Sequence, residues 1–178
     1  RYTTALSRHE VPVCLSLHDF GVYRRMLDIG GNSGEFALGA CMAHPDLVAT
    51  VADLPLVCDI GRNHVSQYEE SSRIHFLPGD WLNDTPPGSY DLVCFKSILH
   101  DWPEPAVEQF LSNAFDALEP GGTILIFERS SFASSRTRIG YGSLPLLLFY
   151  KSFRDPSAYL AALRRAGFDS VNFLQVDL

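Results

Sequence analysis

The chain has 178 residues, of which 46% are hydrophobic and 20% are charged, and its formal net charge is −7. This length and composition are ordinary for one globular domain with a buried core. Because binding to nucleic-acid phosphates needs clustered Lys and Arg, the acidic balance argues against nucleic acid as a partner. No segment approaches the roughly 18 consecutive apolar residues of a membrane-spanning helix, so we expect no membrane partner either.

Four cysteines lie far apart in the chain, without a C-x-x-C pair: Cys14, Cys41, Cys58 and Cys94. This pattern favours reduced thiols in a cytoplasmic protein and argues against a structural zinc, so we expect no metal. The chain starts at Arg1 rather than Met, and we expect it to be a piece of a longer protein.

From residue 24 onward, short apolar runs alternate with segments whose apolar residues have helical spacing. The strands that this pattern predicts are 26–29, 47–51, 73–77, 90–95, 123–127 and 171–176, with a Gly121-Gly122 break before the fifth. The helices that it predicts are 35–43, 55–68, 105–118 and 158–165, after a helical opening at 2–9. Strands that alternate with helices imply an α/β fold, a doubly wound, Rossmann-like, mostly parallel sheet with helices on both faces.

The first candidate site is the turn Asp28-Ile29-Gly30-Gly31-Asn32-Ser33-Gly34, which joins the first strand to the following helix. Glycines let the backbone turn sharply and approach a ligand, and the helix start presents N–H groups to an anionic group. In a doubly wound sheet a nucleotide-like ligand binds beyond the carboxyl ends of the strands. A tight turn without a ligand is the alternative, and the turn alone is a weak signal.

Two acids follow the next two strands at the same edge. Asp53 comes directly after the second strand, where an acid can accept both hydroxyls of a ribose. Asp53 also suits a helix N-cap before Leu54-Pro55, and the two roles are compatible. After the third strand, Asp80 can accept from an adenine amino group and Trp81 can cover the ring. An ordinary turn and a core tryptophan are the alternative for these two residues.

A histidine follows the fourth strand, in the segment FKSILHDW (95–102). A lone histidine is ordinarily structural, but His100 lies just past a central strand at the ligand-binding edge. Its free pKa of about 6.5 suits proton removal near neutral pH. Glu128 ends the neighbouring fifth strand, where it can hydrogen-bond the imidazole and set its tautomer. A solvated carboxylate, or a partner for Arg129, is the alternative for Glu128.

Together these segments resemble the S-adenosylmethionine-dependent O-methyltransferases typified by the caffeate, flavonoid and acetylserotonin O-methyltransferases. The matching blocks, in family order, are LDIGGNSG (27–34), ADLPLV (52–57), PGDWL (78–82), FKSILHDWPE (95–104) and LEPGGTILIFE (118–128). The resemblance implies a class I methyltransferase fold, here lacking the last antiparallel strand, and no metal. It also implies S-adenosylmethionine as cofactor, S-adenosylhomocysteine as product, a small aromatic hydroxyl acceptor, and a homodimer for the full-length protein.

The resemblance also assigns roles by position. His100 becomes the general base and Glu128 its orienting partner. Gly30 and Gly31 line the methionine end of the cofactor, and Asp53 binds its ribose. Asp80 and Trp81 contact the adenine, and Lys96 lies near the adenine-side contacts. The resemblance also makes Asp28 and Leu54 cofactor-binding residues.

Two positions depart from the family. Asn32-Ser33 stands where a third Gly and a Thr are frequent, a mild change. Phe153 stands just before the matched Arg154, where many members carry a second acid. His100 is therefore expected to have one carboxylate partner instead of two.

The resemblance divides the chain at residue 23. Residues 1–23 become a helical lead-in to a domain outside this chain, and 24–178 the S-adenosylmethionine-binding catalytic domain. The uncharged apolar run at 144–150 is too short to cross a membrane. We expect it to wall the acceptor pocket or to face the missing domain, with ordinary core as the alternative.

Two other functions fit parts of the sequence. A nicotinamide-dependent oxidoreductase also uses a Gly-rich turn and a ribose acid, but Gly30-Gly31-x-x-Gly34 lacks the G-x-G-x-x-G spacing. That function also leaves the H-D-W segment unexplained. A non-catalytic domain that binds the cofactor or a partner without transferring a methyl group is the other alternative, which Phe153 and the missing flanks keep open.

Overall fold

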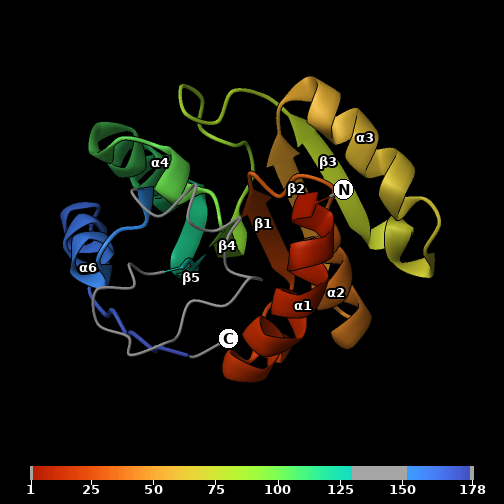
Figure 1. The fold of residues 1–178 in the computed structure, drawn as a ribbon, viewed down its shortest axis with the longest axis horizontal. Coiled ribbons are helices and arrows are strands. Elements are labelled where there is room, and N and C mark those ends of the chain that lie inside the picture. Colours follow the sequence, from red (N-terminus) through yellow and green to blue (C-terminus); the bar gives the residue numbers. More distant parts are fainter. Residues whose placement is uncertain (1, 130–151, 177–178) are drawn as a thin grey trace.

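A five-stranded parallel sheet forms the centre of the computed structural model, which describes residues 2–129 and 152–176 (Figure 1). The strands are β1 (Arg25–Ile29), β2 (Val48–Asp53), β3 (Ile74–Pro78), β4 (Tyr90–Lys96) and β5 (Leu118–Phe127). The helices are α1 (Tyr2–Leu17), α2 (Glu35–Ala43), α3 (Pro55–Val65), α4 (Glu104–Ala117) and α6 (Pro156–Arg165). The strand order is β3-β2-β1-β4-β5, and every neighbouring pair is parallel. The order reverses between β1 and β4, which is where ligands bind in open α/β sheets.

Successive side chains of a strand point to opposite faces of the sheet, so the central strands contribute to two separate cores, one on each face. Met26 and Leu92 belong to the core that includes residues of α1 and α2. Leu27 and Val93 belong to the other core, with residues of α4 and α6. Figure 1 shows α4 and α6 on one side of the sheet and α1 and α2 on the other. The α/β doubly wound class predicted from the sequence is therefore confirmed.

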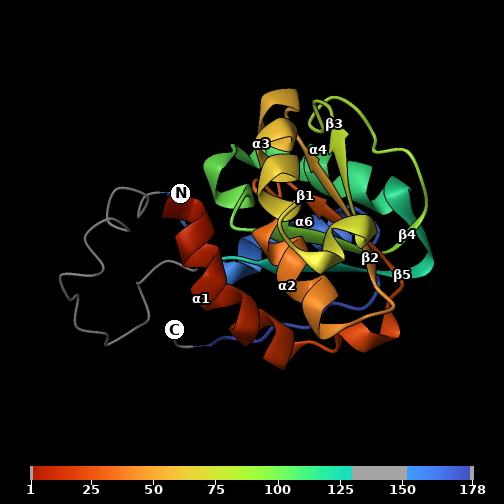
Figure 2. The same cartoon turned by 90° about the vertical axis from the view of Figure 1, so that its right-hand side faces the viewer.

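Helix α1 belongs physically to this body. It packs along α2, as Figure 2 shows, and it adds Val11 and Cys14 to one core. The helical opening predicted at 2–9 thus extends to Leu17, and it ends before the polar residues His18 and Asp19. The boundary at residue 23, with a lead-in before it, stays a prediction. Among residues 2–129 and 152–176, none of the helices combines the length and apolar character that a bilayer span requires.

Two sequence-based predictions are wrong. The strand predicted at 171–176 is not a strand, and Phe173 and Leu174 in it are exposed. Alternating apolar residues do not make a strand where no neighbouring edge pairs with them. The break predicted at Gly121-Gly122 lies inside β5, where an irregular register opposite Tyr90 and Leu92 accommodates it. The apolar run at 144–150 lies outside the described residues.

Candidate active site

Hydrogen bonds join the carboxyl ends of β1, β2 and β3 at one edge of the sheet. One oxygen of the Asp53 carboxylate accepts from the backbone N–H of Asn32 at 2.9 Å, and the other accepts from Leu54 N–H at 2.8 Å. The backbone N–H of Gly79 donates to the Asp53 carbonyl at 3.0 Å. The glycine turn, Asp53 and the turn after β3 are therefore immediate neighbours, as their positions after parallel strands predicted.

The glycine turn is packed too closely for side chains. A Cβ on Gly31 would collide with the Asp28 carboxylate, and a Cβ on Gly30 would collide with the side chain of Ile98. Gly30 also has a φ of +69°, in the left-handed region that favours glycine. This backbone thus lies directly against Asp28 on one side and the turn after β4 on the other.

Asp28 is a fully buried carboxylate whose two oxygens have no hydrogen-bond partner among the described residues. Its burial raises the pKa to about 7; the positive charge of Lys96 opposes this rise and the charge of Asp53 adds to it. Leaving a buried acceptor unpaired costs about 1–3 kcal/mol. A hydrogen-bond donor or a cation bound beside the glycine turn would therefore stabilise the Asp28 carboxylate.

The structure places Asp80 and Trp81 after β3, where both side chains already have contacts within the protein. The Asp80 carboxylate accepts from the side-chain amide of Asn83 at 2.7 Å and from Leu82 N–H at 3.3 Å. Trp81 is buried in the core that includes α4, and its indole N–H has no partner in the described part of the chain. Leu54, by contrast, is exposed at this edge. Contacts of Asp80 and Trp81 with an adenine stay predictions.

Lys96 is paired with α1. Its Nζ lies 2.5 Å from a carboxylate oxygen of Glu10, with both side chains 7% exposed, and donates to Ser7 Oγ at 3.1 Å. Glu10 also pairs with Arg129. Because β1 and β2 separate β4 from β3, this arrangement does not bring Lys96 beside Asp80. Sequence reasoning missed Glu10, since 86 positions separate it from Lys96 and nothing local marks the pair.

His100 and Glu128 form the predicted pair. Imidazole Nδ1 lies 2.7 Å from Oε2 of Glu128, and the two side chains are 10% and 4% exposed. The other carboxylate oxygen accepts from the backbone N–H groups of Ile98 and Leu99 at 2.8 and 2.7 Å. Since an ionised carboxylate only accepts, Nδ1 carries the proton and Nε2, 3.4 Å from Asp101 Oδ1, is the basic nitrogen.

The electrostatic surroundings strengthen this base. Burial by itself would lower the pKa of His100, but the hydrogen bond and charge of Glu128, together with Asp101, raise it above its ordinary value. Arg129 acts in the opposite direction and does not reverse the rise. A raised pKa means that this imidazole holds a proton more tightly than a free imidazole does.

Phe153 packs edge-on against the imidazole. The ring centroids of Phe153 and His100 are 5.3 Å apart, the planes cross at 63°, and Phe153 is buried. An aromatic ring thus occupies the position beside His100 where the resemblance implies a second acid in many family members. Glu128 is the carboxylate that hydrogen-bonds the ring, and the exposed Asp101 lies farther away.

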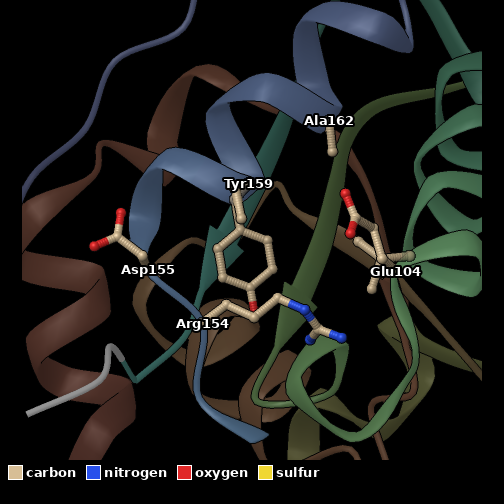
Figure 3. Close-up of a pocket in the computed structure, with 7 residues that line it drawn as sticks. Glu104, Arg154, Asp155, Tyr159 and Ala162 are labelled. Atoms are coloured by element: carbon tan, nitrogen blue, oxygen red, sulfur yellow. The ribbon is translucent and has the colours of Figure 1, made fainter.

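Sequence reasoning also missed Arg154, whose guanidinium donates to the carbonyls of Leu99 and Trp102 on either side of His100. Figure 3 shows Arg154 beside Tyr159 in a pocket between α4 and α6 that also has Glu104 in its lining. The pocket does not include His100 or the strand-end acids. No group of three or more His, Cys, Asp or Glu in the described residues is arranged to hold a metal ion.

Comparisons with known proteins give a consistent result. The model of the O-methyltransferase domain family matches residues 4–169. The chain is 37% identical over 110 residues to 3-hydroxy-5-methyl-1-naphthoate 3-O-methyltransferase of Streptomyces sahachiroi, covering 62% of this chain and 32% of that protein. It is 32% identical over 172 residues to acetylserotonin O-methyltransferase of Bos taurus, covering 92% of this chain and 48% of that protein. The chain therefore spans no more than about half the length of these relatives.

A solved structure with the same fold is that of human N-acetylserotonin methyltransferase in complex with S-adenosylmethionine. The TM-score is 0.82 and the sequence identity is 27%, over 97% of this chain and 50% of that chain.

Proposed function

The chain belongs to the O-methyltransferase domain family, and from this premise we propose that it binds S-adenosylmethionine and serves methyl transfer to a hydroxyl oxygen of a small aromatic molecule. The observation that carries the proposal is the His100–Glu128 pair, in the turn after β4 whose Ile98 side chain lies against Gly30. The acceptor class is supported by relatives that are named for a hydroxynaphthoate and for acetylserotonin.

The residues at the strand ends fit this cofactor. The unpaired buried carboxylate of Asp28 lies directly against Gly31, and its charge suits the ammonium of a methionine moiety bound at the glycine turn. Each Asp53 oxygen accepts one backbone N–H and keeps lone pairs for ribose hydroxyls. We assign the adenine end to the edge formed by the exposed Leu54, Asp80 and the ring of Trp81. Lys96 has the weakest support, because its charge is already paired with Glu10.

The step performed by residues of this chain is removal of the proton from the acceptor's hydroxyl group. When bound, S-adenosylmethionine supplies a methyl group activated on a sulfonium. His100 Nε2 takes the acceptor's hydroxyl proton, and Glu128 holds Nδ1 and stabilises the resulting cation. A phenol titrates near 10, so proton removal accompanies attack on the methyl group. Phe153 packs edge-on against the imidazole.

The proposal extends to the complete protein as a cytoplasmic homodimer, with residues 1–23 as the lead-in to a further helical domain. Four buried cysteines that form no disulfide support the cytoplasmic location. The dimer rests on the family resemblance.

Binding and turnover test the proposed function separately. Thermal shift and calorimetry of the complete protein with S-adenosylhomocysteine measure binding, with NAD as the comparison ligand. Methyl transfer from labelled S-adenosylmethionine is then assayed on a panel of phenols that includes N-acetylserotonin. We expect stabilisation by S-adenosylhomocysteine and transfer to at least one phenol. Stabilisation by NAD alone would favour an oxidoreductase, and binding without transfer to any phenol would favour a non-catalytic domain.

A further inference from the structure

The backbone turn that carries His100 is irregular and needs support. It enters through Ser97, a non-glycine residue with a φ of +54°, in a region that L-residues rarely adopt. It continues as a single 3₁₀ turn at Leu99–Asp101 before α4 begins at Glu104. The turn has two backbone hydrogen bonds of its own, from Asp101 N–H to the Ile98 carbonyl at 3.1 Å and from Trp102 N–H to the Leu99 carbonyl at 3.3 Å, and side chains from elsewhere add to them.

Two oppositely charged side chains bind this turn from its two ends. Glu128 takes the donors at its start, the N–H groups of Ile98 and Leu99. Arg154 binds acceptors on either side of His100: Nη1 donates to the Leu99 carbonyl at 2.7 Å, and Nη2 donates to the Trp102 carbonyl. His100 lies between the two points of attachment.

The shape and the surroundings of Arg154 suit this role. A guanidinium is planar and presents its donors as a rigid fork, so it can bind two carbonyls that are three residues apart. Its side chain runs beside the buried ring of Tyr159, as Figure 3 shows, and this ring limits where the guanidinium can move. The neighbouring Phe153 contacts the imidazole itself. The adjacent residues Phe153 and Arg154 therefore contact both the ring of His100 and the backbone of its turn.

We propose that Arg154 is a positioning residue for the base: its guanidinium fixes the 98–102 turn and thereby keeps the imidazole of His100 on Glu128. The consequence for turnover rests on the proposed function, whereas the effect on His100 itself does not. Arg154 acts through the turn and does not take the proton.

The titration of His100 distinguishes positioning from a simple charge effect. Among the described residues, the charged groups that act on the imidazole include Glu128, Asp101 and Arg129, and none of these three changes in an Arg154 variant. Loss of a nearby positive charge would by itself raise the pKa of His100. Loss of the contact with Glu128 would lower the pKa of His100, because Glu128 contributes most to raising it. A fall in the titration midpoint therefore reports displacement of the imidazole.

The experiment compares Arg154→Ala, Arg154→Lys and Arg165→Ala in the complete protein by NMR titration of the His100 imidazole. Arg154→Lys keeps the positive charge but cannot donate to both carbonyls as the planar guanidinium does. It also provides the test if the alanine variant does not fold. Arg165 is the matched control, since it lies on α6 and pairs with Glu104 and Glu108 on α4 without contacting the turn. We expect both Arg154 variants to lower the midpoint and Arg165→Ala to leave it unchanged.

Turnover of labelled S-adenosylmethionine with the phenol panel gives the second readout. We expect the Arg154 variants to lose about 10- to 100-fold in kcat, with affinity for S-adenosylhomocysteine within about twofold of wild type. An unchanged midpoint in both Arg154 variants, or an equal fall in Arg165→Ala, overturns the inference. A lowered midpoint in a protein that methylates no phenol supports the positioning role and counts against the proposed function alone.

Discussion

The Asp53 carboxylate accepts a hydrogen bond from the backbone N–H of Asn32 at 2.9 Å. The acid at the end of β2 thus holds the glycine turn that follows β1. Asp53 therefore sets the conformation of this turn in addition to the ribose contact proposed for it, so changes at this residue should affect the whole proposed cofactor site.

We predict that Asp53→Ala weakens binding of S-adenosylhomocysteine by about 1–3 kcal/mol, the cost of leaving buried polar groups unpaired. Isothermal calorimetry measures the change. Asp59→Ala is the control, because Asp59 is an exposed carboxylate on α3 that pairs only with Arg62 in the described residues. Equal affinities of the wild type and Asp53→Ala would contradict the ribose assignment.

We predict that His100→Ala lowers kcat by about 10²- to 10⁴-fold, the usual contribution of a general base, and leaves cofactor affinity nearly unchanged. His64→Ala is a matched control: His64 is another partly buried imidazole that hydrogen-bonds a glutamate, Glu35, at 2.7 Å. Steady-state rates and calorimetry separate the two effects. If His100→Ala keeps the wild-type rate at neutral pH, His100 is structural.

Much of this arrangement could be predicted because it depends on local sequence. Helix α2 was predicted with its observed bounds, Glu35–Ala43, from a run rich in Ala and Leu. The central strands are buried on both faces, so they appear as continuous apolar runs. His100 and Glu128 follow neighbouring parallel strands, so the strand order predicted from the sequence already brings the two segments to the same edge of the sheet.

Other features could not be predicted because their partners carry no sequence signal. Arg154 binds backbone carbonyls, which every residue possesses, so no pattern marks them. Glu10 is brought next to Lys96 by the packing of α1 along α2, which no local sequence pattern marks. The alternation at 171–176 resembles a strand, but a strand also needs an adjacent edge to pair with.

We predict that Glu128→Gln lowers kcat, by less than His100→Ala, and shifts its pH dependence. The single amide oxygen of Gln is needed by the N–H groups of Ile98 and Leu99, so the hydrogen bond to Nδ1 is lost. The pKa of His100 then falls towards its ordinary value, and the acidic limb of kcat/KM moves to lower pH. Rates between about pH 5 and pH 9 test this. An unchanged profile would make Glu128 a bystander.

The same variant should change stability with a definite sign. The folded-state pKa of His100 is raised, so the folded protein binds this proton more tightly than the unfolded chain. The stabilisation is fully present below the unfolded pKa of about 6.5 and is lost as the pH rises through the folded pKa. We therefore expect Glu128→Gln to lose more stability near pH 5 than near pH 8, as measured by urea unfolding. A difference that does not vary with pH would count against the pair.

Asp28→Asn should affect stability and binding in opposite directions. Burial raises the folded-state pKa of Asp28 to about 7, far above its unfolded value of about 3.9. A raised acid pKa means that stability falls as the pH rises from the unfolded value through the folded one, because the buried group must ionise. We predict that the neutral amide makes the ligand-free protein more stable than the wild type at about pH 8, with little difference near pH 4.

The ligand reverses this preference. If the Asp28 carboxylate receives the ammonium of the cofactor's methionine moiety, the charged form is the one that binds. Wild-type affinity for S-adenosylhomocysteine should then rise as the pH passes through about 7, and Asp28→Asn should bind more weakly and without that rise. Unfolding curves of the ligand-free proteins and calorimetry across the same pH range measure the two effects. An asparagine variant that binds as tightly as the wild type at high pH would remove Asp28 from the cofactor site and leave its burial without a functional reason.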